Sequence, residues 1–371
     1  MARIVLAGGG TGGHIFPMQA VAAALVEGGL TNDSLAYVGS QRGQESVILG
    51  SGSIPLVTLP GRGLRRSLRV EAMRENIRAL VGLVVATARA CWLFARWRPA
   101  VAVSFGGYAA LPAGLAAVFW RRPLVLVDLD ATPGATQRVL ARFARARCVA
   151  HDASDPRDVV TGVPLREAIT SIDRGDGARR AARARFRPPI PEGRLVLVVM
   201  TGSLGSRSVN DAVSDLALAW RARSDVTILH VTGRRDVDQV RARAPHLEGL
   251  DYRIYDFADM VELWGVADVA LCRAGATTLA ELCALGIAAV LVPLPGAPGD
   301  HQGHNARRLA NAGAALVLDD ASLSGEVLAS TLEELIANGR YHEMGRAALD
   351  LARPDAARAI ADVVRRAGGF S

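Results

Sequence analysis

Five glycines and one histidine stand in the first turn of the chain. The apolar run Ile4–Ala7 is followed by the residues GGGTGGH at positions 8–14, and a helical pattern covers Phe16–Val26. Glycine has no Cβ, so its N–H group can approach a ligand closely, and the amino end of the following helix carries partial positive charge. We therefore predict a loop that binds an anion or a polar oxygen, in which His14 is the one titratable group.

Two other interpretations of this loop stay open. Gly8, Gly10 and Gly13 have the spacing of a dinucleotide fingerprint, which is typical of an oxidoreductase that uses NAD or FAD. That fold also expects an acidic residue at the end of the second strand, and the strand expected over Ser34–Ser40 has none. In the third interpretation His14 only caps a helix or fills a polar pocket.

A second glycine-rich turn has the composition of a diphosphate site. Residues 201–207 read TGSLGSR and follow the apolar run Leu195–Met200. The turn offers successive amides before an expected helix, the hydroxyls of Ser203 and Ser206, and the guanidinium of Arg207. A tight turn that needs small residues is the alternative.

A carboxylate is expected close to a third polar turn. Glu281 lies at helical spacing from Thr277 and Thr278, behind the turn that begins at Cys272. A carboxylate in this position can accept two hydrogen bonds from a ribose diol. An ordinary surface glutamate would need no such explanation.

Two series of alternating strands and helices must position these residues. The first runs to about residue 165, the segment Ile172–Glu192 indicates a linker with a charged surface helix, and the second series starts at Leu195. We predict an α/β fold with two Rossmann-like domains facing each other across a cleft, residues 1–165 and 166–349, and a last helix, about 350–371, that packs back on the first domain. The predicted strands are Ile4–Ala7, Leu35–Val38, Leu56–Leu59, Val101–Ser104, Leu124–Val127, Cys148–Ala150, Leu195–Met200, Val226–His230, Tyr252–Tyr255, Val269–Leu271, Ala289–Val292 and Ala315–Val317.

Composition excludes several classes of enzyme. All 43 basic residues are arginine, so there is no lysine for a Walker A loop, a pyridoxal Schiff base or a Ser-x-x-Lys nucleophile. The formal net charge of +7 suits anionic partners such as phosphates or an acidic membrane, but the arginines are too scattered to favour nucleic acid. Cys91, Cys148, Cys272 and Cys283 lie in apolar segments without CxxC spacing, and we expect buried, reduced thiols in a cytosolic protein.

The chain shows no signal-peptide pattern, and its longest uncharged stretch, Ala100–Trp120, is expected to be a buried strand and a helix. Arginines are mixed with apolar and tryptophan side chains over Leu64–Trp97, and Trp120 precedes two more arginines. This mixture suits the headgroup region of an anionic membrane, although the apolar side could equally be core. The residues concerned are Arg65, Arg66, Arg69, Arg74, Arg78, Leu80, Val81, Val84, Trp92, Phe94, Trp97, Trp120, Arg121 and Arg122.

Seven motifs in the same order make the chain resemble the MurG family, the membrane-associated N-acetylglucosaminyltransferases of peptidoglycan synthesis. The resemblance covers nearly the whole chain. The motifs are residues 9–14 (GGTGGH), 61–66 (GRGLRR), 104–108 (SFGGY), 161–166 (TGVPLR), 202–207 (GSLGSR), 272–281 (CRAGATTLAE) and 300–302 (DHQ).

The resemblance implies an inverting glycosyltransferase of the GT-B fold on the cytoplasmic side of the cell membrane. It would move N-acetylglucosamine from UDP-GlcNAc to the lipid-linked muramyl sugar of lipid I, giving lipid II, with UDP-GlcNAc as donor and no cofactor. His14 matches the general base of the family. The donor contacts implied are Thr11, Gly12, Gly13, Asp130, Arg166, Ser203, Leu204, Gly205, Phe257, Ala276, Thr277, Thr278, Glu281 and Gln302. The acceptor-side residues implied are Gly107, Tyr108 and Asp128.

The chemistry is consistent with this assignment. A neutral imidazole can take the proton of a sugar hydroxyl as the new bond forms, and loop amides with Arg166 can stabilise the leaving UDP. The second series has no Asp-x-Asp pair at a strand end, so we expect transfer without a metal. The chain departs from the family at residues 127–130, where VDLD replaces His-Glu-x-Asn. A different acceptor, or a UDP-sugar-binding module without turnover, therefore stays an alternative.

Overall fold

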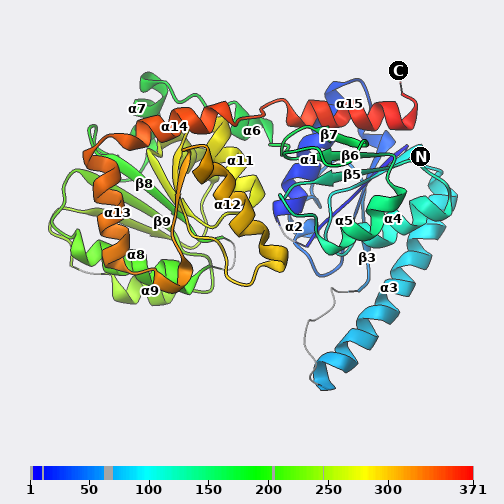
Figure 1. Ribbon diagram of the computed structural model, residues 1–371, viewed down its shortest axis with the longest axis horizontal. Coiled ribbons are helices and arrows are strands. Elements are labelled where there is room, and N and C mark those ends of the chain that lie inside the picture. The colour runs from blue at the N-terminus through cyan, green and yellow to red at the C-terminus, as the bar shows by residue number, and fades with distance from the viewer. Residues whose placement is uncertain (1–2, 11, 62–69, 203–204, 245, 371) are drawn as a thin grey trace. The chain divides into compact units, whose positions relative to one another are not determined.

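A computed structural model describes residues 3–10, 12–61, 70–202, 205–244 and 246–370, and gives only the backbone for residues 70–77. The chain forms two compact units, of which the first combines Met1–Arg166 with Arg353–Ser371 and the second is Glu167–Ala352 (Figure 1). Each unit is built on one parallel sheet. The predicted fold class, two Rossmann-like α/β domains, is confirmed.

The sheet of the first unit has seven strands in the order β3-β2-β1-β4-β5-β6-β7. Its central strands are runs of small and branched apolar residues because helices cover both faces of a parallel sheet. Strand β1, for example, is at most 1% exposed along its whole length. Strand β7 has no counterpart among the predicted strands. The strands are β1 (Ile4–Ala7), β2 (Leu35–Ser40), β3 (Leu56–Leu59), β4 (Val101–Ser104), β5 (Leu124–Asp128), β6 (Ala146–Val149) and β7 (Asp158–Val160).

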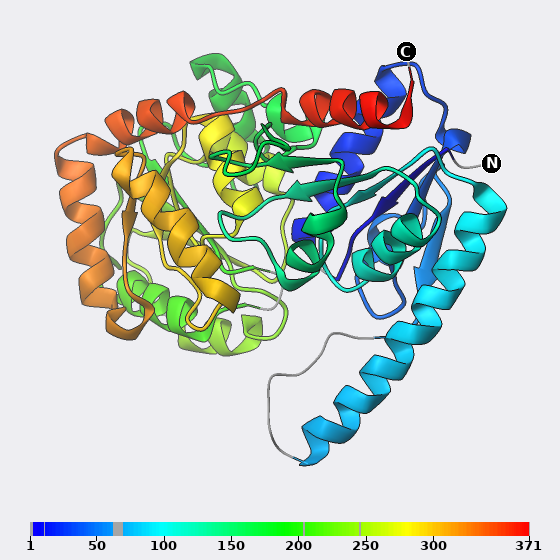
Figure 2. The same cartoon turned by 45° about the vertical axis from the view of Figure 1, so that its right-hand side comes forward.

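Helices α3 and α4 pack together over one core of this unit, and α15 packs against α1 (Figure 2). The last helix of the chain thus belongs to the first unit. Helix α1 begins at Gly12, four residues before the expected Phe16, so His14 lies in its first turn. The helices are α1 (Gly12–Glu27), α2 (Glu45–Ile48), α3 (Val70–Trp97), α4 (Ala110–Phe119), α5 (Ala135–Leu140) and α15 (Ala356–Gly368), with 3₁₀ turns at Asn32–Ser34 and Ala141–Phe143.

The second unit repeats this plan with six strands in the order β10-β9-β8-β11-β12-β13. Its largest core lies between the sheet and helices α8 and α13, where Val213, Leu216 and Leu328 are completely buried. The strands are β8 (Leu195–Met200), β9 (Val226–Val231), β10 (Asp251–Tyr255), β11 (Val269–Cys272), β12 (Ala288–Leu291) and β13 (Ala315–Val317).

The charged segment Ile172–Glu192 contains helix α7, none of whose residues is buried. This confirms the predicted surface helix. Arg179 pairs with Asp268, which fixes α7 to the start of β11. The helices of the unit are α6 (Glu167–Thr170), α7 (Asp176–Arg185), α8 (Arg207–Ala219), α9 (Val237–Arg243), α10 (Met260–Val266), α11 (Ala276–Leu285), α12 (His301–Asn311), α13 (Gly325–Ala337) and α14 (Arg340–Asp350), with 3₁₀ turns at Pro298–Asp300 and Asp320–Ser322.

Two expectations about apolar segments can be compared with the structure. Ala100–Trp120 forms β4 and α4, as expected. The cysteine prediction is only partly right: all four thiols are free, but Cys91 on α3 is half-buried whereas Cys148, Cys272 and Cys283 are buried.

Helix α3 presents much of its apolar surface outward. Its segment Arg78–Trp97 is apolar and long enough to cross a membrane, with a mean hydropathy of 1.5, and only 28% of it is buried. Length and composition alone do not distinguish such a helix from a surface or core helix. Of the two alternatives left open for this segment, Phe94 follows the second, because its side chain is 2% exposed and lies in the core under α3. Arg65, Arg66 and Arg69 lie outside the described residues, and the side chain of Arg74 is not described.

Candidate functional site

The first glycine loop, which follows β1, packs closely against the loop that follows β4. Gly9 and Gly10 have φ values of 149° and 101°, which favour glycine. A Cβ on Gly107, in the loop after β4, would lie 2.2 Å from the carbonyl oxygen of Gly9. The two loops touch backbone to backbone because β1 and β4 are adjacent. Thr11 lies outside the described residues, and Gly12 is the first residue of α1.

The imidazole of His14 lies over the loop after β4. A Cβ on Gly106 would be 3.4 Å from both Cδ2 and Nε2 of His14, and 3.9 Å from Cγ of Gln137. A side chain at position 106 would thus begin in van der Waals contact with the ring, and the φ of 87° at this position favours glycine. His14 is partly exposed, and the neighbouring Gly13 is exposed. The first loop therefore presents an imidazole at the carboxyl end of the sheet, as a base would require.

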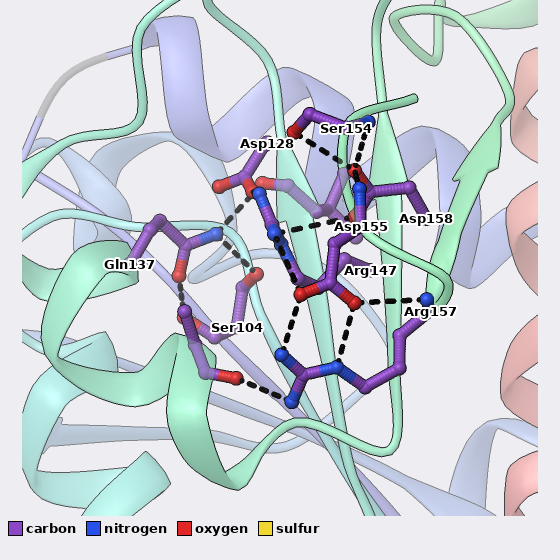
Figure 3. A network of polar contacts seen from close by, with 10 residues as sticks. Ser104, Asp128, Gln137, Arg147, Ser154, Asp155, Arg157 and Asp158 are labelled. Atoms are coloured by element: carbon purple, nitrogen blue, oxygen red, sulfur yellow. Dashed lines mark hydrogen bonds and ion pairs between the residues drawn. The ribbon is translucent and has the colours of Figure 1, made fainter. Parts of the chain in front are cut away.

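Gln137 holds the ends of β4 and β5 together (Figure 3). Its amide nitrogen donates to the carbonyl oxygens of Val127, at 2.9 Å, and Ser104, at 3.2 Å. The hydroxyl of Ser104 donates to the Gln137 amide oxygen at 2.7 Å, and Thr136 donates to the carbonyl of Gly107 at 3.0 Å. The loop that faces His14 is therefore fixed by buried hydrogen bonds.

Asp128, which we expected on the acceptor side, is the last residue of β5 and is 5% exposed. Its carboxylate lies 3.5 Å from Arg147, whose guanidinium also reaches Asp158 at 3.3 Å and Asp155 at 3.9 Å (Figure 3). Burial raises the pKa of Asp128, and the charge of Arg147 opposes that rise. A buried carboxylate needs a charged partner, so the contact with Arg147 gives Asp128 a structural role at this position.

The other residues expected on this edge are spread over several loops. The hydroxyl of Tyr108 donates to the carbonyl of Pro60 at 3.4 Å, and burial raises its pKa. Asp130, expected as a donor contact, is half-buried just beyond β5. The guanidinium of Arg166, a second expected donor contact, stacks on the ring of Phe16 in α1, 4.2 Å from its centroid.

The second glycine loop follows β8 in the second unit. Gly202 and Gly205 have φ values of 84° and 83°, and the expected contacts Ser203 and Leu204 between them lie outside the described residues. A Cβ on Gly205 would be 2.5 Å from the carbonyl oxygen of Thr232, in the loop after β9. Any other residue at 205 would have to displace that loop.

Arg273, which the sequence analysis did not single out, organises this edge. Its guanidinium donates to the hydroxyl of Ser206 at 2.5 Å, to the carbonyl of Pro293 at 3.1 Å, and pairs with Asp320 at 2.6 Å. The hydroxyl of Ser206, which we expected to bind a phosphate, thus accepts a hydrogen bond from Arg273. Arg207 remains 70% exposed at the first position of α8.

The expected ribose-binding carboxylate, Glu281, is 7% exposed on α11. Its Oε2 accepts a hydrogen bond from the indole nitrogen of Trp264 at 2.9 Å. Trp264 is itself completely buried, so it holds the carboxylate in one orientation. The expected contacts Ala276, Thr277 and Thr278 form the first turn of the same helix and are partly exposed.

Two further expected donor contacts lie on separate segments of this unit. Phe257 is 67% exposed after β10, and the guanidinium of Arg234 lies 5.8 Å from its ring centroid. Gln302, in the first turn of α12, accepts a hydrogen bond from the backbone of Leu294 at 3.0 Å. An exposed aromatic ring can take a nucleobase by stacking.

Among the described residues, no three His, Cys, Asp or Glu side chains are grouped so that they could hold a metal ion. The polar residues that could not be identified from local sequence have one property in common. Each of them forms a hydrogen bond or ion pair with a residue at least ten positions away in the sequence. They are Gln137, Arg147, Trp264 and Arg273, together with Glu45, which is described below.

Comparison with known proteins gives the same assignment along the whole chain. Residues 4–149 match the glycosyltransferase family 28 N-terminal domain, and residues 196–360 match the family 28 C-terminal domain. The chain is 34% identical to a protein of Desulforudis audaxviator (strain MP104C) over 383 residues, covering 99% of both chains. It is 37% identical to a protein of Salinibacter ruber (strain DSM 13855 / M31) over 370 residues, 97% of this chain and 95% of the other. Both carry the name UDP-N-acetylglucosamine--N-acetylmuramyl-(pentapeptide) pyrophosphoryl-undecaprenol N-acetylglucosamine transferase.

A solved structure agrees with these matches. The crystal structure of MurG from Acinetobacter baumannii superimposes with a TM-score of 0.76 at 27% identity, covering 98% of this chain and 99% of that one.

Proposed function

The chain belongs to the MurG enzymes of glycosyltransferase family 28, and from this membership we propose that it transfers N-acetylglucosamine from UDP-GlcNAc to undecaprenyl-pyrophosphoryl-N-acetylmuramyl-pentapeptide, lipid I, to form lipid II of peptidoglycan. Identity of 34% over 99% of the chain is the observation that carries this proposal. Both family 28 domains are matched, and each unit has one parallel sheet.

His14 is proposed as the general base. Its ring lies within van der Waals distance of position 106, in the loop after β4, and Gln137 ties the ends of β4 and β5 together. The imidazole takes the proton of the muramyl hydroxyl while the hydroxyl oxygen bonds to the anomeric carbon of the donor. The bond from that carbon to UDP breaks on the opposite side, so UDP leaves with the electron pair and the anomeric configuration inverts.

The second unit is proposed to bind UDP-GlcNAc. The carboxylate of Glu281, oriented by Trp264, accepts hydrogen bonds from the ribose hydroxyls. Phe257 packs on the uracil, and the loop at 202–207 with Arg207 takes the diphosphate. Arginine and loop amides supply the positive potential at the leaving group, so we propose that no metal or other cofactor is needed.

The test is turnover. Purified protein is supplied with UDP-GlcNAc and a lipid I analogue, and both UDP release and the disaccharide product are measured with and without a metal chelator. We expect product only when both substrates are present, and equal rates with the chelator. Binding of UDP-GlcNAc without product would contradict the transferase proposal, and loss of rate with the chelator would contradict the metal-free mechanism.

We further propose that the protein works at the cytoplasmic face of the membrane, bound through the surface of α3. This helix exposes Val81, Val84 and Trp92 by 59%, 68% and 62%. Arginines on the same helix are also exposed, among them Arg89 and Arg96. Apolar and tryptophan side chains beside arginine suit an anionic leaflet.

Sedimentation with vesicles tests this attachment. At low salt we expect the protein to bind vesicles rich in phosphatidylglycerol and not those of phosphatidylcholine. Val84→Asp should weaken that binding, whereas Leu218→Asp, at a 52% exposed position in the second unit, should not. Indifference to lipid charge, or an equal effect of both variants, would remove α3 as the attachment surface.

A further inference from the structure

A buried carboxylate lies beneath the first glycine loop, and the proposed mechanism does not use it. Glu45, the first residue of α2, is 0% exposed. Its Oε1 accepts hydrogen bonds from the backbone nitrogens of Gly10 and Ser40, both at 2.9 Å. One oxygen atom therefore joins the loop after β1 to the end of β2.

Three glycines make the space that this carboxylate fills. A Cβ on Gly9 would be 1.8 Å from Oε1 of Glu45, a Cβ on Gly43 would be 1.8 Å from Oε2, and a Cβ on Gly39 would be 2.8 Å from Cγ. These glycines come from the loop after β1, the end of β2 and the turn before α2. The cavity is thus shaped for a side chain of this length, and a larger residue at any of the three positions would displace it.

The first glycine loop is therefore held from two sides. Glu45 holds it on the β2 side through Gly10, and the backbone of Gly107 supports Gly9 on the β4 side. Helix α1 begins two residues after Gly10, at Gly12, and His14 is its third residue. The anchor at Gly10 consequently sets the start of the helix that carries the imidazole.

We propose that Glu45 is a positioning residue for His14: by holding the amide of Gly10 to the end of β2, it fixes the first turn of α1 so that the imidazole lies over Gly106. The proposal rests on the function proposed above, in which His14 is the base. Glu45 is completely buried, and we assign it no contact with a substrate. A displacement of about 1 Å at a reacting group can reduce turnover by about 10²-fold, so an anchor at this place has a kinetic effect.

Steady-state kinetics of three single variants test the proposal. Glu45→Ala removes both hydrogen bonds, and we expect kcat to fall about 10- to 100-fold while KM for UDP-GlcNAc changes less than about threefold. Glu45→Gln keeps an oxygen acceptor and should retain most of kcat. Gly43→Ala should resemble Glu45→Ala, because its Cβ takes the place of the carboxylate. Glu27→Ala, at an exposed position of α1, is the matched control.

The double variant Gly43→Ala/Glu45→Ala separates positioning from simple damage. The three atoms nearest to a Cβ on Gly43 all belong to Glu45, so the added methyl group has room once the carboxylate is gone. We expect the double variant to be no slower than the slower single variant. If the two losses multiply, the effect of Gly43→Ala does not act through Glu45, and the proposal fails.

Hydrogen exchange gives a readout that does not depend on turnover. Glu45→Ala should speed amide exchange in the segment from Gly8 to Phe16 and leave exchange in the second unit unchanged. If Glu45→Ala does not fold, Gly43→Ala and Glu45→Gln carry the same comparison. An inactive parent protein would refute the proposed function, whereas an inactive His14→Ala variant beside a fully active Glu45→Ala variant would refute only the role of Glu45.

Discussion

The loop after β1 and the loop after β8 occupy the same place in their sheets, since each follows the third strand in the order of its unit. Each also has a buried carboxylate supplied by the loop after the neighbouring strand. In the first unit this is Glu45, 0% exposed, and in the second it is Asp236, 3% exposed. A Cβ on Gly9 would meet the first carboxylate at 1.8 Å, and a Cβ on Gly205 would meet the second at 2.7 Å.

The charge around the two carboxylates differs. Asp236 is bound by Arg235 at 2.7 Å, with Arg207 at 3.8 Å, and the hydrogen bond from Arg235 lowers the pKa of Asp236. Among the described residues no arginine forms an ion pair with Glu45, which is bound by backbone amides alone. The first loop thus combines an imidazole with a carboxylate that accepts backbone hydrogen bonds, and the second combines a carboxylate bound by Arg235 with the exposed guanidinium of Arg207.

This difference indicates what each loop can bind. A diphosphate at the second loop would meet Arg207 and a helix amino terminus. We therefore propose that the same backbone plan serves proton transfer in one unit and binding of a charged donor in the other.

Removal of the imidazole should have the largest effect. His14→Ala should lower kcat about 10²- to 10⁴-fold, the usual contribution of a general base, while the dissociation constant for UDP-GlcNAc stays the same. Rapid-quench turnover and calorimetry measure the two quantities. A variant with normal turnover would show that the first loop has no catalytic group.

Loss of the Glu281 carboxylate on α11 should weaken donor binding and leave the chemical step unchanged. Glu281→Gln removes the charge that would hold the ribose, and affinity for UDP should fall about 10- to 100-fold, the value of a charged hydrogen bond. Calorimetry with UDP measures this. Trp264→Phe removes only the indole donor to Glu281 and should weaken binding less. A loss of kcat at saturating donor, with unchanged affinity, would contradict the assignment of donor binding to the second unit and of proton transfer to the first.

Acid should destabilise β9, the strand beside β8 in the second unit. Burial lowers the pKa of His230 to about 3, and its ring bonds to Asn210 at 2.9 Å, which in turn donates to Asp236 at 3.1 Å. In the unfolded chain the pKa is near 6.5, so below that pH the unfolded state binds the extra proton and stability falls as the pH drops toward 3.

Between pH 7 and pH 5 this one group should reduce the free energy of opening of β9 by about 2 kcal/mol. Native-state hydrogen exchange of β9 measures it. His230→Gln cannot gain a proton and should lose that part of the pH dependence. The same slope in parent and variant would show that His230 is not the group responsible.

The smallest effect is expected from Arg235. Arg235→Ala makes the second loop resemble the first by leaving Asp236 less compensated, and affinity for UDP should fall about threefold, because exposed ion pairs are screened by water. The effect should shrink in high salt. Arg221→Ala is the matched control, since both arginine side chains are 50% exposed and Arg221 pairs with Glu248 on the surface.

Local sequence pattern was sufficient for the strands and for both glycine loops. Buried parallel strands are continuous apolar runs, and glycine marks the turns that follow them, so β1 and β8 could be predicted residue by residue. Strand β7 was missed because Asp158–Val160 is short and only its neighbour β6 supports it. The start of α1 was placed late because glycines at its first positions hide a helix that tertiary contacts stabilise.

The partners of the candidate residues could not be predicted in the same way. Glu45 lies in a polar turn without periodicity, and its bond to Gly10 spans 35 residues. Trp264 reads as an ordinary core residue until its indole nitrogen is found beside Glu281. Asp128 was identified by its position after a strand, but whether it faces a substrate or Arg147 depends on β6, which follows much later in the chain. Such pairs depend on the assembled fold.

The return of α15 to the first unit has a consequence for synthesis on the ribosome. Its side chains Ile360 and Val364 are buried, and the helix contacts α1 and strands β4 to β6, although the whole second unit precedes it in the chain. The second unit, Glu167–Ala352, is continuous and can complete its core as soon as it emerges. The first unit must wait until α15 has been made, so nascent chains that stall before this helix will expose the unit's apolar face to chaperones and proteases.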